Sequence, residues 1–324
     1  NNEYFNKIEK GYTLTGYYIE PALTYYPSKS IRIKAGAHFL KYYGLHGFEK
    51  VEPLVSVQVE LARNLYLMFG SIYGTIHHRL IEPVYHFERF LEENNEEGLQ
   101  FLYDSKIFYA DAWINWETFI QPGDPFQEKF NAGSYIELRA IEKNRLNIHL
   151  PLQFIAKHTG GQINSGGGQV TSVFNSSFGA KMKFGMNKHN DYIWLEGHYV
   201  NFFGQVHDEY AFKKGNGLYL QAGILYAPFH FLLSYWNANT YISPLGDPIY
   251  QCMSQVDQTY NEPHRSLLIP RVQYTKTFKK GIDIGLRFDG YYDINHKNLD
   301  YSYSIYLLFR RDFFITNVKS EATR

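Results

Sequence analysis

Apolar and polar residues alternate one for one along many segments of this chain. Successive side chains of a β-strand point to opposite faces, so each such segment predicts a strand with one apolar and one polar face. No segment shows the helical spacing over a comparable length. The clearest alternating segments are residues 31–39, 51–59, 110–117, 146–154, 282–288 and 301–309.

The alternating segments are longer than the strands of a soluble β-sandwich or solenoid. They run for roughly ten to thirteen residues, the length that crosses a bilayer at a tilt, whereas soluble strands average about five or six residues. Aromatic residues also crowd the segment ends, as in the aromatic girdles of membrane barrels. We therefore favour a membrane barrel over a soluble β protein. The terminal aromatics are Tyr17, Tyr18, Tyr25, Tyr26, Tyr42, Tyr43, Phe202, Phe203, Tyr291, Tyr292, Phe313 and Phe314.

Short and long connections alternate along the chain. A transmembrane barrel has this arrangement, with short periplasmic turns and longer extracellular loops. The predicted turns are residues 27–30, 62–64, 104–106, 142–145, 186–191, 227–228 and 279–281. The predicted loops are residues 44–50, 77–97, 121–131, 158–169, 205–215, 243–264 and 295–300.

This segmentation gives about fifteen strands, from residues 13–26 to residues 301–314. Bacterial single-chain barrels have an even number. The first strand precedes a short turn and so runs towards the periplasm, which leaves a preceding upward strand to be found. We predict an all-β, antiparallel up-and-down transmembrane barrel of about 16 strands, with the end of the first strand near residues 1–5. If residues 98–103 are a loop, the number becomes 14.

The domain organisation follows from the same pattern. Residues 1–314 form the barrel and residues 315–324 a short periplasmic tail. No charged segment followed by an apolar stretch opens the chain, so we expect that a signal peptide has been removed or lies outside it.

Composition narrows the functional classes. The 32 Lys and Arg balance 32 Asp and Glu, so no basic field for nucleic acid exists. Mean hydropathy is −0.38, and no apolar run approaches the ~18 residues of a membrane helix. A single cysteine excludes an intramolecular disulfide and a cysteine-rich metal site. Aromatic residues make up 18% of the chain, which suits a barrel with girdles.

The polar residues of the alternating segments would point into the lumen. Charges there must be hydrated, as in a channel, or paired across the interior. Large aromatics on the same face, such as Trp113, Trp194 and Trp236, favour a narrow or obstructed interior. The predicted lumen-lining residues are Arg32, Lys34, Glu52, Glu60, Asp111, Glu117, Glu137, Arg139, Lys181, Lys183, Glu196, Asp283, Arg287 and Asp289.

No local motif indicates catalysis, a metal or a cofactor. Adjacent His77 and His78 would face opposite sides of a strand, and no His-x-x-x-His pair occurs. The loop pair His207 and Asp208 has no neighbouring nucleophile motif. A Ser-Gly-Gly-Gly segment at 165–168 lacks the strand–loop–helix context of a phosphate site. We expect a protein that is not an enzyme and binds no metal or cofactor.

Two long loops are candidates for docking a partner. Tyr85, Phe87, Arg89 and Phe90 lie in a charged and aromatic stretch, and Tyr250 lies in the second loop. Phe87, Phe90 and Leu91 recur at helical spacing, so we expect a short helix in the first loop. Aromatics and Arg are enriched in interface cores. Packing of these side chains over the barrel mouth is the alternative, and it is favoured.

The chain resembles the outer-membrane β-barrel proteins of Bacteroidetes-type bacteria. The residues from Asn2 to Asn6, from Gly11 to Gly16 and from Trp113 to Glu117, with the aromatic closing strand, carry the resemblance. It implies a barrel in the outer membrane of a Gram-negative bacterium, often beside lipoproteins or other barrels.

Two functional hypotheses follow. The first is a non-enzymatic accessory subunit of an outer-membrane complex for export, uptake or barrel assembly. Its partners would be the lipid bilayer, other barrels and lipoproteins. The alternative is a stand-alone channel, or porin, for small solutes.

Overall fold

The described chain forms one antiparallel sheet of 17 strands, which turns and long loops connect. The computed structural model describes residues 1–93, 95–161, 163, 168–186, 191–205, 210–257, 259–278 and 281–316. The strands are β1 (Asn2–Glu3), β2 (Gly16–Ile19), β3 (Ala22–Ser28), β4 (Ile31–Tyr42), β5 (Lys50–Ala62), β6 (Leu65–Ser71), β7 (Glu97–Asp104), β8 (Phe108–Thr118), β9 (Lys129–Glu142), β10 (Leu146–Thr159), β11 (Thr171–Gly185), β12 (Tyr192–Gln205), β13 (Lys214–Tyr226), β14 (Phe229–Asn239), β15 (His264–Phe278), β16 (Ile282–Asp293) and β17 (Asn298–Phe309). The helical pieces are η1 (Thr75–His78), α1 (Arg89–Glu92) and η2 (Pro248–Tyr250).

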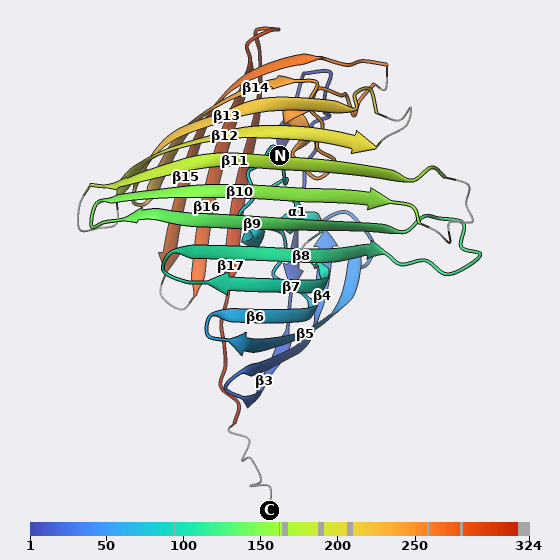
Figure 1. The fold of residues 1–324 in the computed structure, drawn as a ribbon, viewed down its shortest axis with the longest axis vertical. Coiled ribbons are helices and arrows are strands. Elements are labelled where there is room, and N and C mark those ends of the chain that lie inside the picture. The colour runs from blue at the N-terminus through green and yellow to red at the C-terminus, as the bar shows by residue number, and fades with distance from the viewer. Residues whose placement is uncertain are drawn as a thin grey trace, which may run out of the picture.

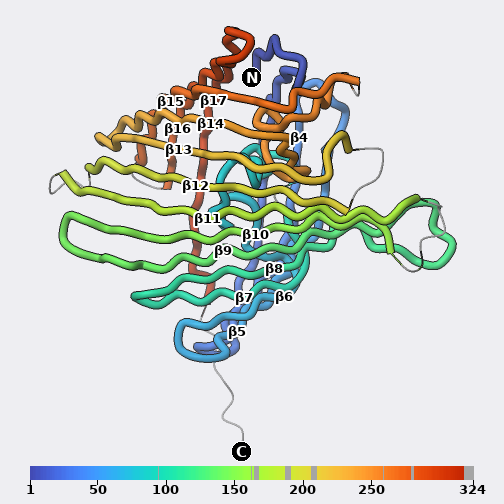
Figure 2. Tube along the Cα trace, turned by 45° about the horizontal axis from the view of Figure 1, so that its top comes forward, coloured from blue at the N-terminus to red at the C-terminus, as the bar shows by residue number. Residues whose placement is uncertain are grey.

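From β4 to β17, neighbouring strands in the sequence pair antiparallel with each other. β2 and β3 both pair with β4 and form two halves of one interrupted strand. β1 pairs with β17 at the other edge. The sheet curls strongly, so that β15–β17 lie behind the front strands (Figure 1), and Figure 2 shows the same curl. It is not closed into a complete barrel.

The strands form because side-chain character alternates at the period of an extended chain. On β12, Trp194 and Val200 are buried on the inner face, whereas Leu195 and Tyr199 are about half exposed on the outer face. Strands β8 to β17 run for 11 to 15 residues, as a tilted bilayer crossing requires. Their length and alternation confirm the predicted up-and-down membrane architecture.

The strand count also agrees with the sequence. When β2 and β3 count as one and the two-residue β1 is set aside, the 17 strands of the described chain become 15. Residues 98–103 lie within β7, so the alternative in which they form a loop is wrong. Short turns and long loops gather at opposite ends of the front strands (Figure 1).

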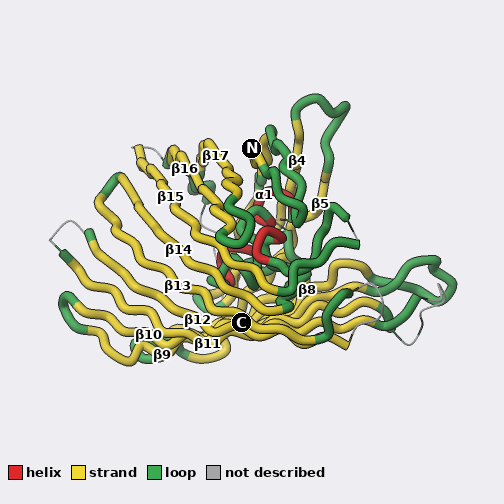
Figure 3. Tube along the Cα trace, turned by 90° about the horizontal axis from the view of Figure 1, so that it is seen from above, coloured by secondary structure: helices red, strands yellow, loops and turns green. Residues whose placement is uncertain are grey.

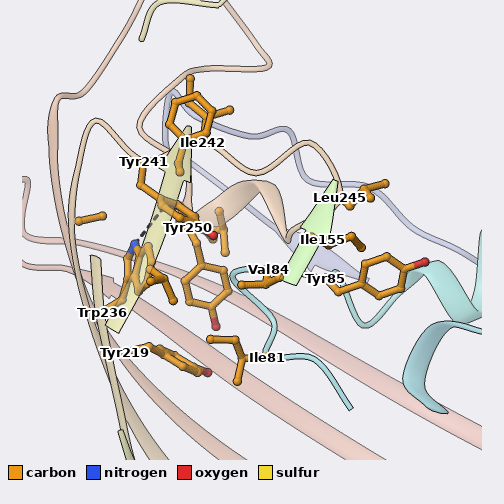
Figure 4. Packing of buried hydrophobic residues seen from close by; sticks show 14 of the residues in the cluster. Ile81, Val84, Tyr85, Ile155, Tyr219, Trp236, Tyr241, Ile242, Leu245 and Tyr250 are labelled. Carbon is orange, nitrogen blue, oxygen red and sulfur yellow. Dashed lines mark hydrogen bonds between the residues drawn. The ribbon is translucent and has the colours of Figure 1, made fainter. Parts of the chain in front are cut away.

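The two longest loops fold into the curl of the sheet and form its core. We name them the inner loops: residues 72–96 and residues 240–263. From above, the strands fan around these segments (Figure 3). Ile81 and Val84 of the first loop lie among Tyr241, Tyr250 and Trp236 (Figure 4). The Trp236 indole Nε1 donates to the Tyr250 carbonyl at 2.9 Å. The interior of the sheet is therefore filled by the protein's own loops.

The remaining predictions concern helices and the tail. Within the described residues, no helix combines the length and apolar character of a membrane span. The predicted tail falls mostly on residues 317–324, outside the described residues. Phe313 and Phe314, which precede it, are exposed.

Candidate functional site

Most of the predicted lumen-lining charges meet partners on the inner face. Asp111, Glu117, Lys181 and Arg139 each take part in an ion pair. Arg32 donates to the Tyr73 hydroxyl. The other predicted residues of this set lie on the same face by alternation: Lys34, Glu52, Glu60, Glu137, Lys183, Glu196, Asp283, Arg287 and Asp289.

The strongest of these networks fastens the first inner loop to the wall. The Glu82 carboxylate accepts from Arg271 Nη2 at 2.7 Å and from Arg287 Nη2 at 3.0 Å. Both guanidinium groups also bind Asp289. The two arginines hold the pKa of Glu82 well below its ordinary value against the effect of burial. One loop carboxylate thus joins two strands, and the sequence could not place it because Glu82 is 189 residues from Arg271.

A second buried network surrounds His78. Its Nδ1 lies 2.7 Å from Asp111 Oδ2, and its Nε2 lies 3.2 Å from Glu96 Oε2. The imidazole stacks on Trp113 with ring centroids 3.5 Å apart. Burial acts to lower the pKa of His78, but the two carboxylates outweigh it and raise the pKa to about 9. The charged imidazole therefore anchors the loop rather than serving as a base.

The loop residues considered for docking do not form an accessible surface. Tyr85, Phe90 and Tyr250 are buried in the core, because the inner loops turn inwards rather than outwards. Phe87 packs against Tyr306 and the Arg287 guanidinium. Arg89 lies over the Tyr85 ring. Three of the five residues are thus buried and Phe87 and Arg89 are half-buried, which favours packing within the barrel mouth, and docking of a partner on these loops stays a prediction.

The N-terminal segment meets the first inner loop in a polar cluster, which we call the N-terminal centre: Asn2, Glu9, Tyr12, Glu88 and Asp247. Tyr12 donates to Glu88 Oε2 at 2.5 Å, and Asn2 Nδ2 donates to the same oxygen at 3.4 Å. Asn2 Oδ1 and Glu9 Oε2 are buried without a hydrogen-bond partner among the described residues. Burial raises the pKa of Glu9, and neighbouring Asp247 and Glu88 add to that rise.

Beside this centre, His86 Nε2 lies 3.6 Å from Asp247 Oδ2. Burial raises the pKa of Asp247 to about 6. A cavity of about 10 Å³, lined by both residues, holds roughly one water. The pair could orient a water. Asn2, Glu9 and Asp247 are buried, whereas Tyr12, His86 and Glu88 are half-buried.

One inner-face arrangement has the order of a catalytic triad. Ser177 Oγ lies 2.8 Å from His198 Nδ1, and His198 Nε2 lies 2.9 Å from Glu196 Oε1. Ser177 and His198 are each 1% exposed. A triad whose nucleophile is sealed from both water and lipid has no route to a substrate. We treat it as a buried polar network.

A different serine and histidine meet on the outer face, and we call them the outer-wall pair: Ser172 and His158. They are directly opposite in the β10–β11 ladder, and Ser172 Oγ lies 2.8 Å from His158 Nδ1. Their neighbours in sequence, Val173 and Lys157, point inwards. Both members of the pair are half-buried, so a membrane lipid can approach them.

Aromatic side chains surround this pair on the outer face. The His158 ring lies 4.8 Å from the Phe130 ring, centroid to centroid. Phe154, Phe174 and Phe203 form a row of rings with successive centroids 6.3 Å apart. The pair lies at the long-loop, extracellular ends of β10 and β11. Aromatic belts mark the level where lipid headgroups meet acyl chains, which is where ester bonds lie.

Chemically, the pair offers a nucleophile and a base. Ser172 can attack an ester carbonyl, and His158 can take its proton. Among the described residues, no carboxylate lies within ion-pair distance of His158, so the pair is a dyad.

One cluster has the spacing of a metal site. Single oxygen or nitrogen atoms of Glu262, Asp293 and His296 lie within 4.8 Å of one another. The Arg265 guanidinium already bridges the two carboxylates, at 2.9 Å and 3.1 Å. The cluster is accounted for as a buried salt bridge.

Sequence reasoning missed the outer-wall pair. His158 was one histidine among thirteen, and its partner lies across a loop whose length does not fix the register. The available signal was a polar residue at an outward position near the extracellular end of two successive strands. The loop pair His207 and Asp208, and most of segment 165–168, lie outside the described residues.

Comparison with known proteins gives the family. A family model described as "Lipid A 3'-O-deacylase-type" matches residues 1–318. This agrees with the resemblance to Bacteroidetes-type outer-membrane proteins. No curated protein matches the chain. The description names an enzyme, so the expectation that the chain is not an enzyme is wrong.

The chain is also similar to solved outer-membrane proteins, and the first of the following two shows the same fold. A loop L8 deletion mutant of OmpT, an outer membrane protein of Vibrio cholerae, is 12% identical, with a TM-score of 0.54 and 95% of each chain covered. OprD from Pseudomonas aeruginosa is 9% identical, with a TM-score of 0.46, covering 86% of this chain and 84% of that one. The chain is an outer-membrane barrel protein of the Gram-negative type.

Proposed function

Because the chain belongs to the lipid A 3'-O-deacylase-type family, we propose that it hydrolyses an ester-linked acyl chain of lipid A at the outer-wall pair. Ser172 is the nucleophile and His158 the general base. The observation that supports this assignment most directly is the 2.8 Å contact between Ser172 Oγ and His158 Nδ1 on the lipid-facing side of the sheet.

The three candidate centres are the N-terminal centre, the Ser177–His198 network and the outer-wall pair. They differ in whether a lipid in the membrane can reach them. Lipid A is held in the membrane, so its ester bonds approach the protein from outside the wall. Ser177 and His198 point inwards and are buried, and the N-terminal centre borders a cavity lined by inner-face residues. The outer-wall pair alone among the three combines a nucleophile, a base and a position facing lipid.

The reaction follows from the geometry in two steps. Ser172 Oγ attacks the ester carbonyl while His158 takes the hydroxyl proton, and that proton passes to the departing sugar oxygen. Water, deprotonated by His158, then attacks the acyl-serine, which releases the fatty acid and restores Ser172. The neighbouring Phe154 and Phe174 rings offer an apolar surface for the acyl chain.

Two earlier hypotheses bear on this proposal. The filled interior of the sheet does not favour a stand-alone channel. Membership of a larger envelope complex is compatible with an enzyme and stays a separate proposal. Size analysis after gentle detergent extraction, with identification of co-migrating chains, tests it.

The test of the proposed reaction is the lipid A profile of a Gram-negative host that expresses the protein. Wild type should lower the mass of lipid A by one acyl group, and Ser172→Ala should abolish this shift. Removal of a nucleophile or its base costs activity by several orders of magnitude. His158→Gln should therefore also reduce product below detection.

Matched controls separate catalysis from folding and from the other centres. Ser176 lies on the outer face of β11, two residues after Phe174, and Ser177 lies in the buried polar network. Ser176→Ala and Ser177→Ala should each keep wild-type activity if the variant protein assembles in the membrane. Deacylation that survives Ser172→Ala but is lost in Glu88→Gln or His86→Gln would place the reaction at the N-terminal centre instead. An unchanged lipid A profile with assembled wild type would contradict the proposed function.

A further inference from the structure

The outer-wall pair belongs to a row of polar side chains that crosses three strands. His158 of β10 is directly opposite Ser172 of β11, and Ser172 is directly opposite Gln205 of β12. Residues opposite each other in a ladder share a face, with Cβ atoms about 4.5–5.5 Å apart. Gln205 is exposed and its neighbour Gly204 is buried, so the Gln205 side chain lies on the outer face. The proposed nucleophile therefore has a base on one side and an amide on the other.

Ester cleavage at Ser172 requires a hydrogen-bond donor in addition to the base. As Ser172 Oγ bonds to the carbonyl carbon, the π electrons move onto the carbonyl oxygen, which becomes an oxyanion, and His158 takes the hydroxyl proton. Preorganised donors stabilise that charge in acyl-transfer enzymes, and side-chain amides are among the groups that do so. Loss of one such donor lowers kcat by about 10²–10³.

The backbone of the wall cannot supply this donor. β11 is paired with β10 on one side and with β12 on the other. In an antiparallel sheet the N–H groups point along the sheet towards the neighbouring strands, whereas the side chains stand out from its faces. The N–H groups around Ser172 therefore do not point at an ester that lies against the outer face. The donor must be a side chain.

We propose that Gln205 is this donor, and that its amide Nε2 stabilises the oxyanion formed when Ser172 attacks the ester. This assignment rests on the proposed function. The amide nitrogen of glutamine is three bonds from Cβ, so it can reach an oxygen above the neighbouring Ser172. Asn201, another amide on the outer face of β12, is opposite Ser176. It lies four residues from Gln205, about 13 Å along the strand, and is too distant to serve.

The order of the row also orients the substrate. The base and the donor lie on opposite sides of Ser172, so the carbonyl oxygen points towards β12 and the sugar oxygen towards β10. The bond to the sugar oxygen then breaks, the carbonyl re-forms, and His158 gives the proton to that oxygen. The sugar therefore lies towards Phe130, whose ring centroid is 4.8 Å from that of His158. The acyl chain lies against Phe174 and Phe203, which form the next ladder pair on this face.

Labelling by a long-chain alkyl fluorophosphonate tests the assignment on the purified full-length protein. Ser172 Oγ bonds to phosphorus, fluoride leaves, and His158 takes the proton, while negative charge builds up on the phosphoryl oxygen. The labelled peptide is identified by mass spectrometry, and its rate of formation is measured. Gln205→Ala should slow labelling of Ser172 by about 10²–10³-fold. Gln205→Glu, which keeps the shape but replaces the donor with a carboxylate, should slow it at least as much.

A control and a second measurement separate this role from a structural one. Asn201→Ala removes an amide from the same face of the same strand and should label at the wild-type rate. In lipid A deacylation, Gln205→Ala should lower kcat and leave KM unchanged, because the donor acts on a charge that develops only after attack. Gln205→Ala should also keep the heat-modifiable mobility of the folded protein.

The other outcomes overturn the assignment, and they distinguish it from the proposed function. If Ser172 is labelled equally fast in wild type, Gln205→Ala and Gln205→Glu, Gln205 is not the donor, and Ser172 remains the nucleophile. If Asn201→Ala is as slow as Gln205→Ala, the loss reflects the wall as a whole and not one amide. If Ser172 is not labelled in wild type, the proposed site fails, and the role of Gln205 fails with it.

Discussion

At the scale of single residues, His78 gives a pH-dependent prediction. Its pKa is raised from about 6.5 to about 9 in the folded protein, so its contribution is complete below pH 6.5 and is lost as the pH rises through 9. That contribution is at most about 3 kcal/mol. We expect hydrogen exchange in residues 72–96 to accelerate between pH 8 and pH 10 beyond the intrinsic increase. In His78→Gln the extra acceleration should be absent. An equal pH profile in both proteins would show that the charge of His78 does not hold the loop.

The alternation of apolar and polar residues predicted correctly which face of the sheet a side chain points to, where the neighbours in the same strand determine it. Arg287 and Asp289 were placed on the inner face because their neighbours Leu286 and Phe288 are apolar and outward. Their partner Glu82 could not be found in this way, because a loop 205 residues from Arg287 supplies it. For the same reason Ser172 and His158 were missed. A contact between two strands depends on register, and a single sequence does not specify register across a long loop.

At the scale of elements, the facing of β16 can be tested with one charge. Ile284 lies on the outer face with Leu286 and Phe288, which are 42% and 48% exposed. Ile284→Asp should reduce the folded, heat-modifiable fraction in the outer membrane, because an acidic residue on the lipid face costs up to about 2 kcal/mol. The control is Asp283→Asn on the inner face, which should assemble as wild type. If Ile284→Asp assembled normally, the assignment of Ile284 to the lipid-facing side of β16 would be wrong.

Strands were predictable and loops were not, for a physical reason. A strand's two faces are set by residues next to each other, so β10 and β16 could be recognised from sequence alone. The inner loops fold inwards because their apolar residues, such as Val84 and Ile242, find a core with strand residues far away in sequence. The short helix expected in this loop from the spacing of Phe87, Phe90 and Leu91 is present as α1, but its inward position could not be predicted.

At the scale of the whole molecule, the two inner loops decide whether solute can pass. They bury Val84, Tyr241 and Ile249 completely inside the sheet, and Glu82 ties them to β15 and β16. We therefore expect the purified full-length protein to give no single-channel steps in planar bilayers. Replacement of residues 75–93 by a short Gly-Ser linker should produce steps, because it removes both the apolar filling and the Glu82 anchor. Glu82→Gln, which removes only the anchor charge, should give brief openings at most.

The prediction is tested by comparing the conductance of wild type, the linker variant and Glu82→Gln. If wild type conducted steadily and the linker variant had the same conductance, the loops would not obstruct the interior. The hypothesis of a stand-alone channel would then be supported. If all three proteins were silent while the linker variant remained folded by its heat-modifiable mobility, the inner face itself would be the obstruction. Silence in wild type with conductance in the linker variant fits an enzyme whose barrel is a closed scaffold and whose chemistry takes place on its lipid-facing wall.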